Sequence, residues 1–378
     1  MKRVFLCKET AVGETRAALV PSDVKALDAM GYEIAVQSGA GLSIGHADDE
    51  YAAAGAKIAG TPQEGYQSAD IVVRINKPEG PKGLAAGMLH ISSFDVFNEK
   101  EAIGEFAAAG IGLVSLEMIP RTTLAQKMDI QSSQMSLAGY YAVLLAAARL
   151  PKILPMMTTP SGTISPAKIF IIGVGVAGLQ AIATAKRLGA RVEAFDTRPE
   201  VEEQVKSLGA KFIKIDLGQT GSTEQGYAKE LTPEQIEIQR QAQAKICAGS
   251  DIVITTAKVF GRKAPLLLTK DMTAQMKPGS VIIDMAVKTG GNVEGSSPDG
   301  DVVLDNGVTI IGGDGLERFV PKDASDMFSG NIRAFLEHFW DDESKAFKID
   351  FEDDIMRGCL ITYGGKVVHG RCLKSVAG

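Results

Sequence analysis

A glycine-rich segment in the middle of the chain has the residue types and spacing of a dinucleotide-binding turn. Residues 168–196 read KIFIIGVGVAGLQAIATAKRLGARVEAFD, which is an apolar run, a GxGxxG turn, an alanine-rich segment and a second β-rich run ending on Asp196. Gly173 permits the tight turn, Gly175 allows a pyrophosphate to approach the backbone, and Gly178 allows the helix to pack closely on the sheet. Free N–H groups at the helix start would face the phosphates. Asp196 is placed to accept hydrogen bonds from the adenine-side ribose. The alternative is a glycine turn in an unliganded α/β sheet.

A second cluster of polar side chains precedes a long apolar segment. Residues 121–132 read RTTLAQKMDIQS and bring together Arg121, Gln126, Asp129 and Ser132. Such a set can hold a polar ligand in a loop between two domains. The same residues also suit a purely structural role, because Asp129 and Ser132 are both plausible helix N-caps and Arg121 can pair with Asp129. The residues alone leave both interpretations open.

The expected chemistry limits which other residues matter. A nicotinamide enzyme that oxidises an alcohol or amine needs a base, whereas hydride transfer between two nicotinamide rings needs only positioning and exclusion of water. The chain has four histidines, at positions 46, 90, 338 and 369. His90 lies in an apolar strand and is most simply a core or edge residue. None of the four is excluded as a base by sequence.

Composition bounds the class of protein. The chain has 378 residues, enough for two domains, with 45% hydrophobic and 23% charged residues. A net charge of −6 without a basic cluster argues against nucleic-acid binding. The four scattered cysteines indicate reduced thiols and no metal site. The start MKRVFLCKET is not typical of a signal peptide, and the apolar stretch 137–150 is too short to span a bilayer.

The order of elements predicts an α/β fold with two Rossmann-like parallel-sheet domains separated by a cleft, the C-terminal tail returning to the first domain. We expect an N-terminal α/β domain formed by residues 1–130 and 321–378, a linking helix over 131–150 and a NAD-binding Rossmann domain over 151–320. Residues 151–166 read as a Met-, Thr- and Pro-rich connector, and a closing β-hairpin surrounds Gly364 and Gly365. Strands are predicted at 3–7, 33–36, 71–75, 88–92, 112–116, 168–172, 211–215, 251–255, 281–284 and 308–311.

The stretch 217–233, LGQTGSTEQGYAKELTP, has no apolar period and three glycines. It is either a solvated surface excursion or a mobile lid that carries Tyr227 over the cleft.

Two longer motifs make the chain resemble the NAD(H)-binding component (soluble alpha subunit, domain I) of proton-translocating NAD(P) transhydrogenase. They are PRTTLAQKMDIQSSQMSLAGY and GVGVAGLQAIATAKRLGA, with the later GYAKE and MKPGSVIIDMAV. The resemblance covers nearly the whole chain. It implies that Arg121, Gln126 and Asp129 hold the dihydronicotinamide and its ribose, with Gln126 nearest the transfer step. The implied nucleotide contacts are Arg121, Thr122, Thr123, Leu124, Gln126, Asp129, Ser132, Gly173, Val174, Gly175, Val176, Gly178, Asp196, Thr197, Arg198, Gly226, Tyr227, Ala257 and Lys258.

Arg198 could instead hold a 2′-phosphate, but the Asp196 carboxylate would repel that phosphate, so NAD(H) is the expected nucleotide. The family's NADP(H) lies on another component, and this chain has one complete fingerprint.

The alanine dehydrogenases are the related alternative, since they share the fold and resemble the chain around residues 8–21. Their substrate-side Lys falls on Asn76, their catalytic His aligns near Phe94 with a small offset to His90, and their Asp falls on Lys288. These departures argue against an NAD-dependent amino-acid oxidoreductase. A non-catalytic NAD(H)-binding module is a third possibility.

The resemblance also implies partners and a place in the cell. Hydride would pass between NADH on this chain and NADP+ on a partner component, coupled to proton translocation. The enzyme class is NAD(P)+ transhydrogenase (Si-specific/Re-specific), active only with the NADP(H)-binding component and a membrane-spanning proton-channel subunit. The chain would form a homodimer, bind no nucleic acid, and lie in the cytoplasm, peripheral on the inner face of a bacterial plasma membrane.

Overall fold

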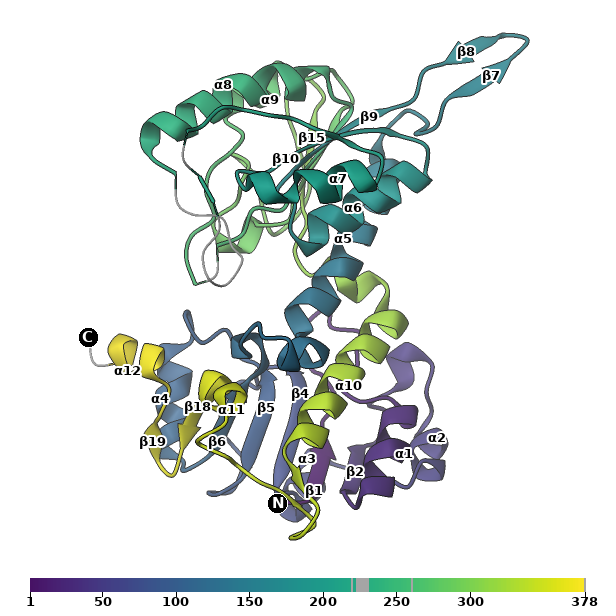
Figure 1. Cartoon of the computed structure of the whole chain (residues 1–378). Helices are drawn as coiled ribbons and strands as arrows, with labels where there is room; N and C mark the ends of the chain where they lie inside the picture. Colours follow the sequence, from purple (N-terminus) through teal and green to yellow (C-terminus); the bar gives the residue numbers. More distant parts are fainter. Residues whose placement is uncertain (219, 222–230, 260, 377–378) are drawn as a thin grey trace. The chain divides into compact units, whose positions relative to one another are not determined.

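The chain forms two compact units in the computed structural model (Figure 1), which describes residues 1–218, 220–221, 231–259 and 261–376. One unit comprises Met1–Gln134 with Arg318–Gly378, and the other comprises Met135–Glu317. The α/β class with two sheets dominated by parallel strands is confirmed. The predicted domain limits and the cleft stay predictions.

The first unit is built on an eight-stranded sheet in the order β19-β18-β6-β5-β4-β1-β2-β3. Its six N-terminal strands are parallel, while β18 and β19 join antiparallel, with β18 beside β6. The predicted return of the tail is therefore confirmed. The strands are β1 (Arg3–Leu6), β2 (Glu33–Gln37), β3 (Lys57–Ala59), β4 (Ile71–Asn76), β5 (Leu89–Ser93), β6 (Gly112–Ser115), β18 (Leu360–Tyr363) and β19 (Lys366–Val367).

Helices on both faces explain why these strands are almost continuously apolar. Helix α3 packs on β1 and β2, and α4 packs on β6 and β18. The N-terminus of α1 has proline as its first residue, and the helix ends at Gly31 in the left-handed conformation that glycine favours. The helices of this unit are α1 (Pro21–Met30), α2 (Asp48–Ala53), α3 (Pro62–Ser68), α4 (Lys100–Ala108), α10 (Pro321–His338), α11 (Asp354–Cys359) and α12 (Gly370–Val376).

The second unit has a seven-stranded sheet in the order β11-β10-β9-β12-β13-β15-β14, parallel except for β14. Along β9, Ile169 and Ile171 enter one apolar core while Phe170 and Ile172 enter the other, so both faces are covered. The strands are β9 (Lys168–Ile172), β10 (Arg191–Phe195), β11 (Lys211–Phe212), β12 (Ile252–Thr255), β13 (Val281–Asp284), β14 (Val302–Val303) and β15 (Thr309–Gly312). The helices are α6 (Val176–Arg187), α7 (Glu202–Ser207), α8 (Pro233–Gly249) and α9 (Lys270–Ala274).

The two large sheets share one topology. In each, the parallel strands run in the sequence order 3-2-1-4-5-6, counted within the unit. The order reverses between β1 and β4 in the first sheet and between β9 and β12 in the second. Ligands of such sheets bind outside the carboxyl ends of the strands at this switch point. The fold therefore offers two places for a ligand, one in each unit.

The segments around the long helix differ in part from expectation. Helix α5 (Ile130–Arg149) matches the predicted helix to within one residue at each end. The connector over 151–166 contains a hairpin of β7 (Met157–Thr159) and β8 (Gly162–Ile164) that the sequence analysis missed, and it projects from its unit (Figure 1). The predicted strand at 211–215 is shorter, since only Lys211 and Phe212 pair with β10. A small hairpin of β16 (Trp340–Asp341) and β17 (Ala346–Phe347) follows α10.

Candidate functional site

The glycine turn after β9 needs glycine at two of its three positions for steric reasons. Gly173 has a φ of +95°, and a Cβ there would lie 2.6 Å from Thr256 Oγ1. A Cβ on Gly178 would lie 2.0 Å from the Gly173 carbonyl oxygen, so helix α6 can pack this closely only without a side chain. A Cβ on Gly175 would meet nothing within 4 Å. Open space thus lies where the sequence predicts a pyrophosphate.

Helix α6 starts directly at this turn with uncompensated backbone donors. Gly175 is its N-cap, and no side chain among the described residues caps it. The first N–H groups of a helix have no partner within the helix, and the helix dipole favours negative charge there. Lys186 and Arg187 lie in the last turn, which suits the opposite end of the dipole. The turn therefore has the donors that a phosphate group needs.

Asp196 lies at the end of β10 but is already engaged within the chain. Its Oδ2 accepts hydrogen bonds from the Val174 backbone N–H at 2.7 Å and from Arg198 Nη2 at 2.7 Å. Its Oδ1 accepts from the backbone N–H and from Nε of Arg198, both at 2.9 Å. Arg198 Nη2 also donates to the Val174 carbonyl at 3.1 Å. A ribose would share Asp196 with Arg198 or displace it, which the sequence analysis did not anticipate.

The loop after β12 is tied to the glycine turn on one side. Thr256 Oγ1 donates to the Gly173 carbonyl at 3.0 Å. The neighbouring Ala257 is clamped by Asn292, whose Oδ1 accepts from the Ala257 N–H at 3.1 Å and whose Nδ2 donates to the Ala257 carbonyl at 2.9 Å. Asn292 Nδ2 also donates to the Pro265 carbonyl at 2.8 Å. The structure therefore holds Ala257 and Lys258, two predicted nucleotide contacts, on the loop next to the turn.

Asn292 and Asp284 are two residues of this site that sequence reasoning missed. Both are fully buried. Asp284 ends β13 and accepts from the N–H groups of Ala286, Asn292 and Val293 at 2.9, 2.9 and 3.1 Å, and from Ser296 Oγ at 2.7 Å. A charged residue at the end of the apolar run VIID, two strands from the glycine turn, was the available signal. These side chains brace the loops at the carboxyl ends of β12 and β13.

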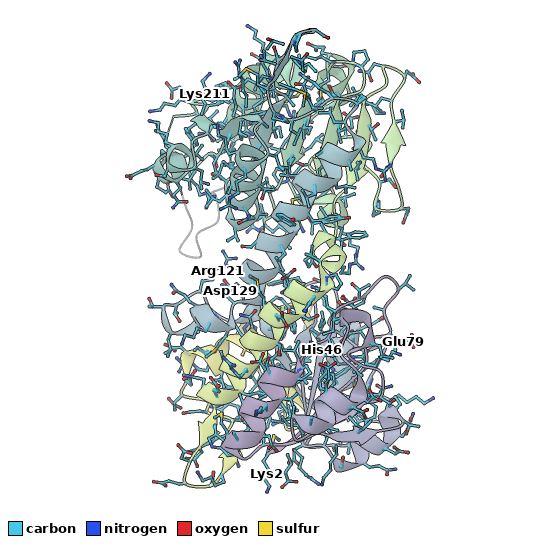
Figure 2. All side chains as sticks on the ribbon, turned by 90° about the vertical axis from the view of Figure 1, so that its right-hand side faces the viewer. Lys2, His46, Glu79, Arg121, Asp129 and Lys211 are labelled. Carbon is cyan, nitrogen blue, oxygen red and sulfur yellow. The ribbon has the colours of Figure 1, made fainter. Side chains whose placement is uncertain are left out.

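The segment 121–132 adopts the structural interpretation in this state. Asp129 caps α5, since its Oδ1 accepts from the Ser132 N–H at 2.9 Å and its Oδ2 accepts from Ser132 Oγ at 2.6 Å. Arg121 Nε lies 3.9 Å from Asp129 Oδ2, and Arg121 Nη2 donates to Gln131 Oε1 at 3.3 Å. Figure 2 shows Arg121 and Asp129 close together in the first unit. The cap and the ion pair explain these two polar residues without a ligand.

The rest of that segment is exposed. Gln126 lies on the surface, on a 3-10 turn over Leu124–Met128, and the side chain of Leu124 is 63% exposed. Thr122 and Thr123 are also exposed. A large apolar side chain in water next to an amide is unusual for a segment with only a structural role. Gly226 and Tyr227, the predicted lid residues, lie outside the described residues.

Two general features limit the chemistry further. Within the described residues, no helix combines the length and the apolar character that crossing a bilayer requires. The same residues contain no group of three or more His, Cys, Asp or Glu side chains that could hold a metal ion.

Comparison with known proteins places the chain in a family. Its residues 5–138 and 142–370 match the models of the N-terminal and C-terminal domains of alanine dehydrogenase/PNT. It is 41% identical over 376 residues to an NAD(P) transhydrogenase subunit alpha chain of Rhodospirillum rubrum, covering 97% of this chain and 98% of that protein. The crystal structure of transhydrogenase from Sinorhizobium meliloti matches with a TM-score of 0.85 and 39% identity, covering 98% of this chain and 100% of that chain. The chain belongs to the alanine dehydrogenase/PNT family, among the NAD(P) transhydrogenase alpha subunits.

Alanine dehydrogenase is a more distant member of this family. That of Mycobacterium tuberculosis is 27% identical over 309 residues, covering 78% of this chain and 75% of that protein. Where the resemblance places its substrate-side Lys, Asn76 Nδ2 donates to Glu14 at 2.8 Å and to Glu9 at 3.3 Å. Phe94 is fully buried, and Lys288 pairs with Asp314 at 2.7 Å. None of the three can act as the ionisable group of an amino-acid oxidoreductase.

The histidines offer no better base for that reaction. His90 is buried in β5, and burial, together with the charge of Arg74, lowers its pKa to about 3, which makes it a weak base. His46 lies beside Glu50, and His338 lies beside Asp353. Burial also lowers the pKa of His369. The transhydrogenase alpha subunits are thus the better guide to this chain within its family.

Proposed function

We propose that this chain is the NAD(H)-binding component of a proton-translocating NAD(P) transhydrogenase. The observation that carries the proposal is the glycine turn after β9, with open space at Gly175 and an uncapped helix N-terminus facing it. The expected adenine-side contacts are Asp196, Thr197 and Arg198, together with the loop of Ala257 and Lys258. NADP(H) would lie on a partner component, as the single fingerprint of this chain suggests.

The nicotinamide end would be held by the segment 121–132. Bound NADH supplies the hydride, and this chain's residues position the ring and exclude water, so no acid or base is required. Gln126 is exposed and free to approach a ligand or a partner surface, and the implied contacts Arg121, Asp129 and Ser132 lie within the same segment. Asp129 would keep its cap while its other lone pairs contact the ribose.

We propose that the chain forms a homodimer through the β7–β8 hairpin. All six strand residues of this hairpin are exposed, and Met157 and Ile164 face water with 46% and 47% exposure; adjacent Met156 is 65% exposed. A projecting two-stranded ribbon with apolar side chains has little stability alone and gains by packing on another chain. The double variant Met157→Ser with Ile164→Ser should shift the molar mass in light scattering from dimer to monomer. A mass that stays dimeric would exclude the hairpin.

The complex would place the chain at the inner face of a bacterial plasma membrane. A separate membrane-spanning subunit would carry the proton channel and couple proton movement to hydride transfer. The stereochemistry of transfer and the dependence on both partners follow from the family resemblance alone.

The deciding experiment mixes the purified chain with the NADP(H)-binding component of a transhydrogenase. Reduction of an NAD+ analogue by NADH is then followed in the presence and absence of NADP(H). We expect exchange only when both the partner component and NADP(H) are present. Absence of exchange together with NADH formation from alanine would instead establish an alanine dehydrogenase, and nucleotide binding with neither reaction would indicate a non-catalytic module.

The role of Gln126 has a sharper test. Gln126→Asn shortens the side chain by one methylene and keeps the amide, so it should slow hydride transfer while NADH affinity changes by less than about tenfold, the mark of lost positioning. Lys127→Gln, on the same exposed turn, is the matched control and should keep the wild-type rate. An unchanged rate in Gln126→Asn would remove this residue from the site.

A further inference from the structure

The switch point of the first sheet contains a pocket that the proposed function does not use. The pocket has a volume of about 380 Å³ and is lined by Thr10, after β1, and by Arg74 and the residues that follow β4. It therefore lies where the strand order reverses between β1 and β4, which is the position where open α/β sheets bind ligands.

Two buried nitrogen atoms that line this pocket lack hydrogen-bond partners within the described residues. They are Arg74 Nε and His90 Nε2. Arg74 is 7% exposed and His90 is 1% exposed. Buried polar groups of native proteins are almost always satisfied, so two such atoms at one cavity indicate an acceptor that is supplied from outside the chain.

The neighbours of Arg74 leave its donors underused. Glu9 Oε1 lies 3.8 Å from Arg74 Nε, beyond hydrogen-bond range, and the Glu9 carboxylate already accepts from the Ile75 N–H at 2.7 Å and from Asn76 at 3.3 Å. Burial also raises the pKa of Glu9. Arg74 Nη2 reaches Thr10 Oγ1 at a long 3.4 Å. The guanidinium thus keeps a planar set of donors for a second acceptor group.

The remaining lining favours a small anion with some apolar surface. Lys82 adds a second cation, and Glu79, on a loop at the edge of the unit (Figure 2), adds one carboxylate. His90 contributes no charge at neutral pH, because burial keeps it neutral, but its Nε2 can donate in the matching tautomer. Tyr66 and Leu84 supply apolar walls.

We propose that this pocket binds a small oxyanion, a carboxylate or a phosphate, through Arg74 and His90. The site lies entirely within the first unit and does not depend on the proposed nucleotide site. It also differs from the positions that the alanine dehydrogenase resemblance assigns to ionisable groups, since Asn76, Phe94 and Lys288 do not line it. The oxyanion would pair with the guanidinium and accept from the imidazole.

The test measures the melting temperature of the full chain against increasing sodium phosphate and, separately, sodium propionate, with sodium chloride at matched ionic strength. We expect a saturable rise with at least one of the two anions. A response to phosphate alone assigns a phosphate site, and a response to propionate alone assigns a carboxylate site. If water alone fills the pocket, neither anion raises the melting temperature more than chloride does, and the proposal is wrong.

Variants locate the effect. Arg74→Gln should weaken the anion affinity by more than tenfold and His90→Gln by about threefold or more. Lys82→Met replaces an exposed side chain and keeps the core intact, so it tests the pocket even if the first two variants fold poorly, and it should weaken affinity several-fold. Arg3→Gln, on the same sheet but ion-paired to Asp70, is the matched control. A response that is equal in Lys82→Met and wild type, or that is lost in Arg3→Gln, would contradict the site.

Discussion

The two sheets have the same strand order, yet their switch points are filled in opposite ways. In the second unit, the switch point is backbone: glycines without side chains, free N–H groups of α6, and loops braced by Asn292 and Asp284. In the first unit, it is side chain: a buried network of Glu14, Arg16, Arg74 and Asn76. The comparison teaches that topology supplies the crevice, while the residues at the strand ends decide whether it receives a dinucleotide or a charged group.

The largest effect should come from breaking the backbone of the second switch point. Gly178→Ala places a methyl group 2.0 Å from the Gly173 carbonyl oxygen, so we expect loss of about 3 kcal/mol in unfolding free energy and of more than about 100-fold in NADH affinity. Gly175→Ala is the informative partner. Its methyl group meets no protein atom, so the melting temperature should stay near wild type while NADH affinity falls. If Gly175→Ala binds NADH normally, the open space is not the pyrophosphate site.

The first switch point should break through its charges. The side chains of Glu14 and Arg16 are 2% and 7% exposed and pair at 2.6 Å. Glu14→Gln leaves Arg16 buried without its carboxylate and should cost about 3 kcal/mol in denaturant unfolding. Glu50→Gln, which removes an exposed carboxylate, is the control and should cost less than about 0.5 kcal/mol.

The same pair sets a pH dependence. Burial alone would raise the pKa of Glu14, but hydrogen bonds and charge from Arg16 hold it below its usual value. A carboxyl whose pKa is lowered by folding contributes stability above its unfolded pKa and loses it as pH falls through the folded value. The stability difference between wild type and Glu14→Gln should therefore be full near pH 6 and shrink below about pH 4.5. A difference that is constant across this range would contradict the ion pair.

A smaller effect should separate bracing from general stability in the second unit. Asn292→Asp sets a carboxylate against the carbonyls of Ala257 and Pro265, so ADP-ribose affinity should fall about tenfold while nicotinamide mononucleotide affinity stays the same. Asn306→Asp is a matched control, because Asn306 clamps the carbonyls of Thr273 and Ala274 in the same way. If both variants weaken ADP-ribose equally, Asn292 has only a structural role.

The smallest effect concerns the cap of α5, after the last parallel strand of the first sheet. Asp129→Ala should lower stability by about 1 kcal/mol, whereas Asp129→Asn keeps a capping oxygen and should stay within about 0.5 kcal/mol. If Asp129 also serves the nicotinamide end, Asp129→Asn slows hydride transfer at unchanged stability. Wild-type transfer in this variant would leave Asp129 as a cap alone.

The sequence predicts well what depends on local sterics. The roles of Gly173 and Gly178 follow from turn geometry, and the closing hairpin at Gly364 was found because its turn signal is strong. The β7–β8 hairpin was missed because three-residue strands of Met, Thr and Gly carry no periodic signal.

Competition between partners is what the sequence could not resolve. Asp196 is flanked by a ribose-binding turn and by Arg198, and only the folded geometry shows that Arg198 occupies both of its oxygens. Asn292 lies 35 residues from the peptide it clamps, so no spacing rule points to it. The pairing of Arg74 with His90 at one cavity likewise depends on the register of β4 and β5.

The antiparallel addition of β18 to β6 has a consequence for biosynthesis. Thr362 donates to the carbonyl of Ile111, 251 residues earlier in the chain. At translation rates of about 5–20 residues per second, the ribosome leaves the edge at Gly112–Ser115 uncovered for roughly 12–50 seconds, while the contiguous unit Met135–Glu317 has already emerged. The nascent protein therefore carries an open strand edge until its last residues arrive, and that interval is when a chaperone has most to protect.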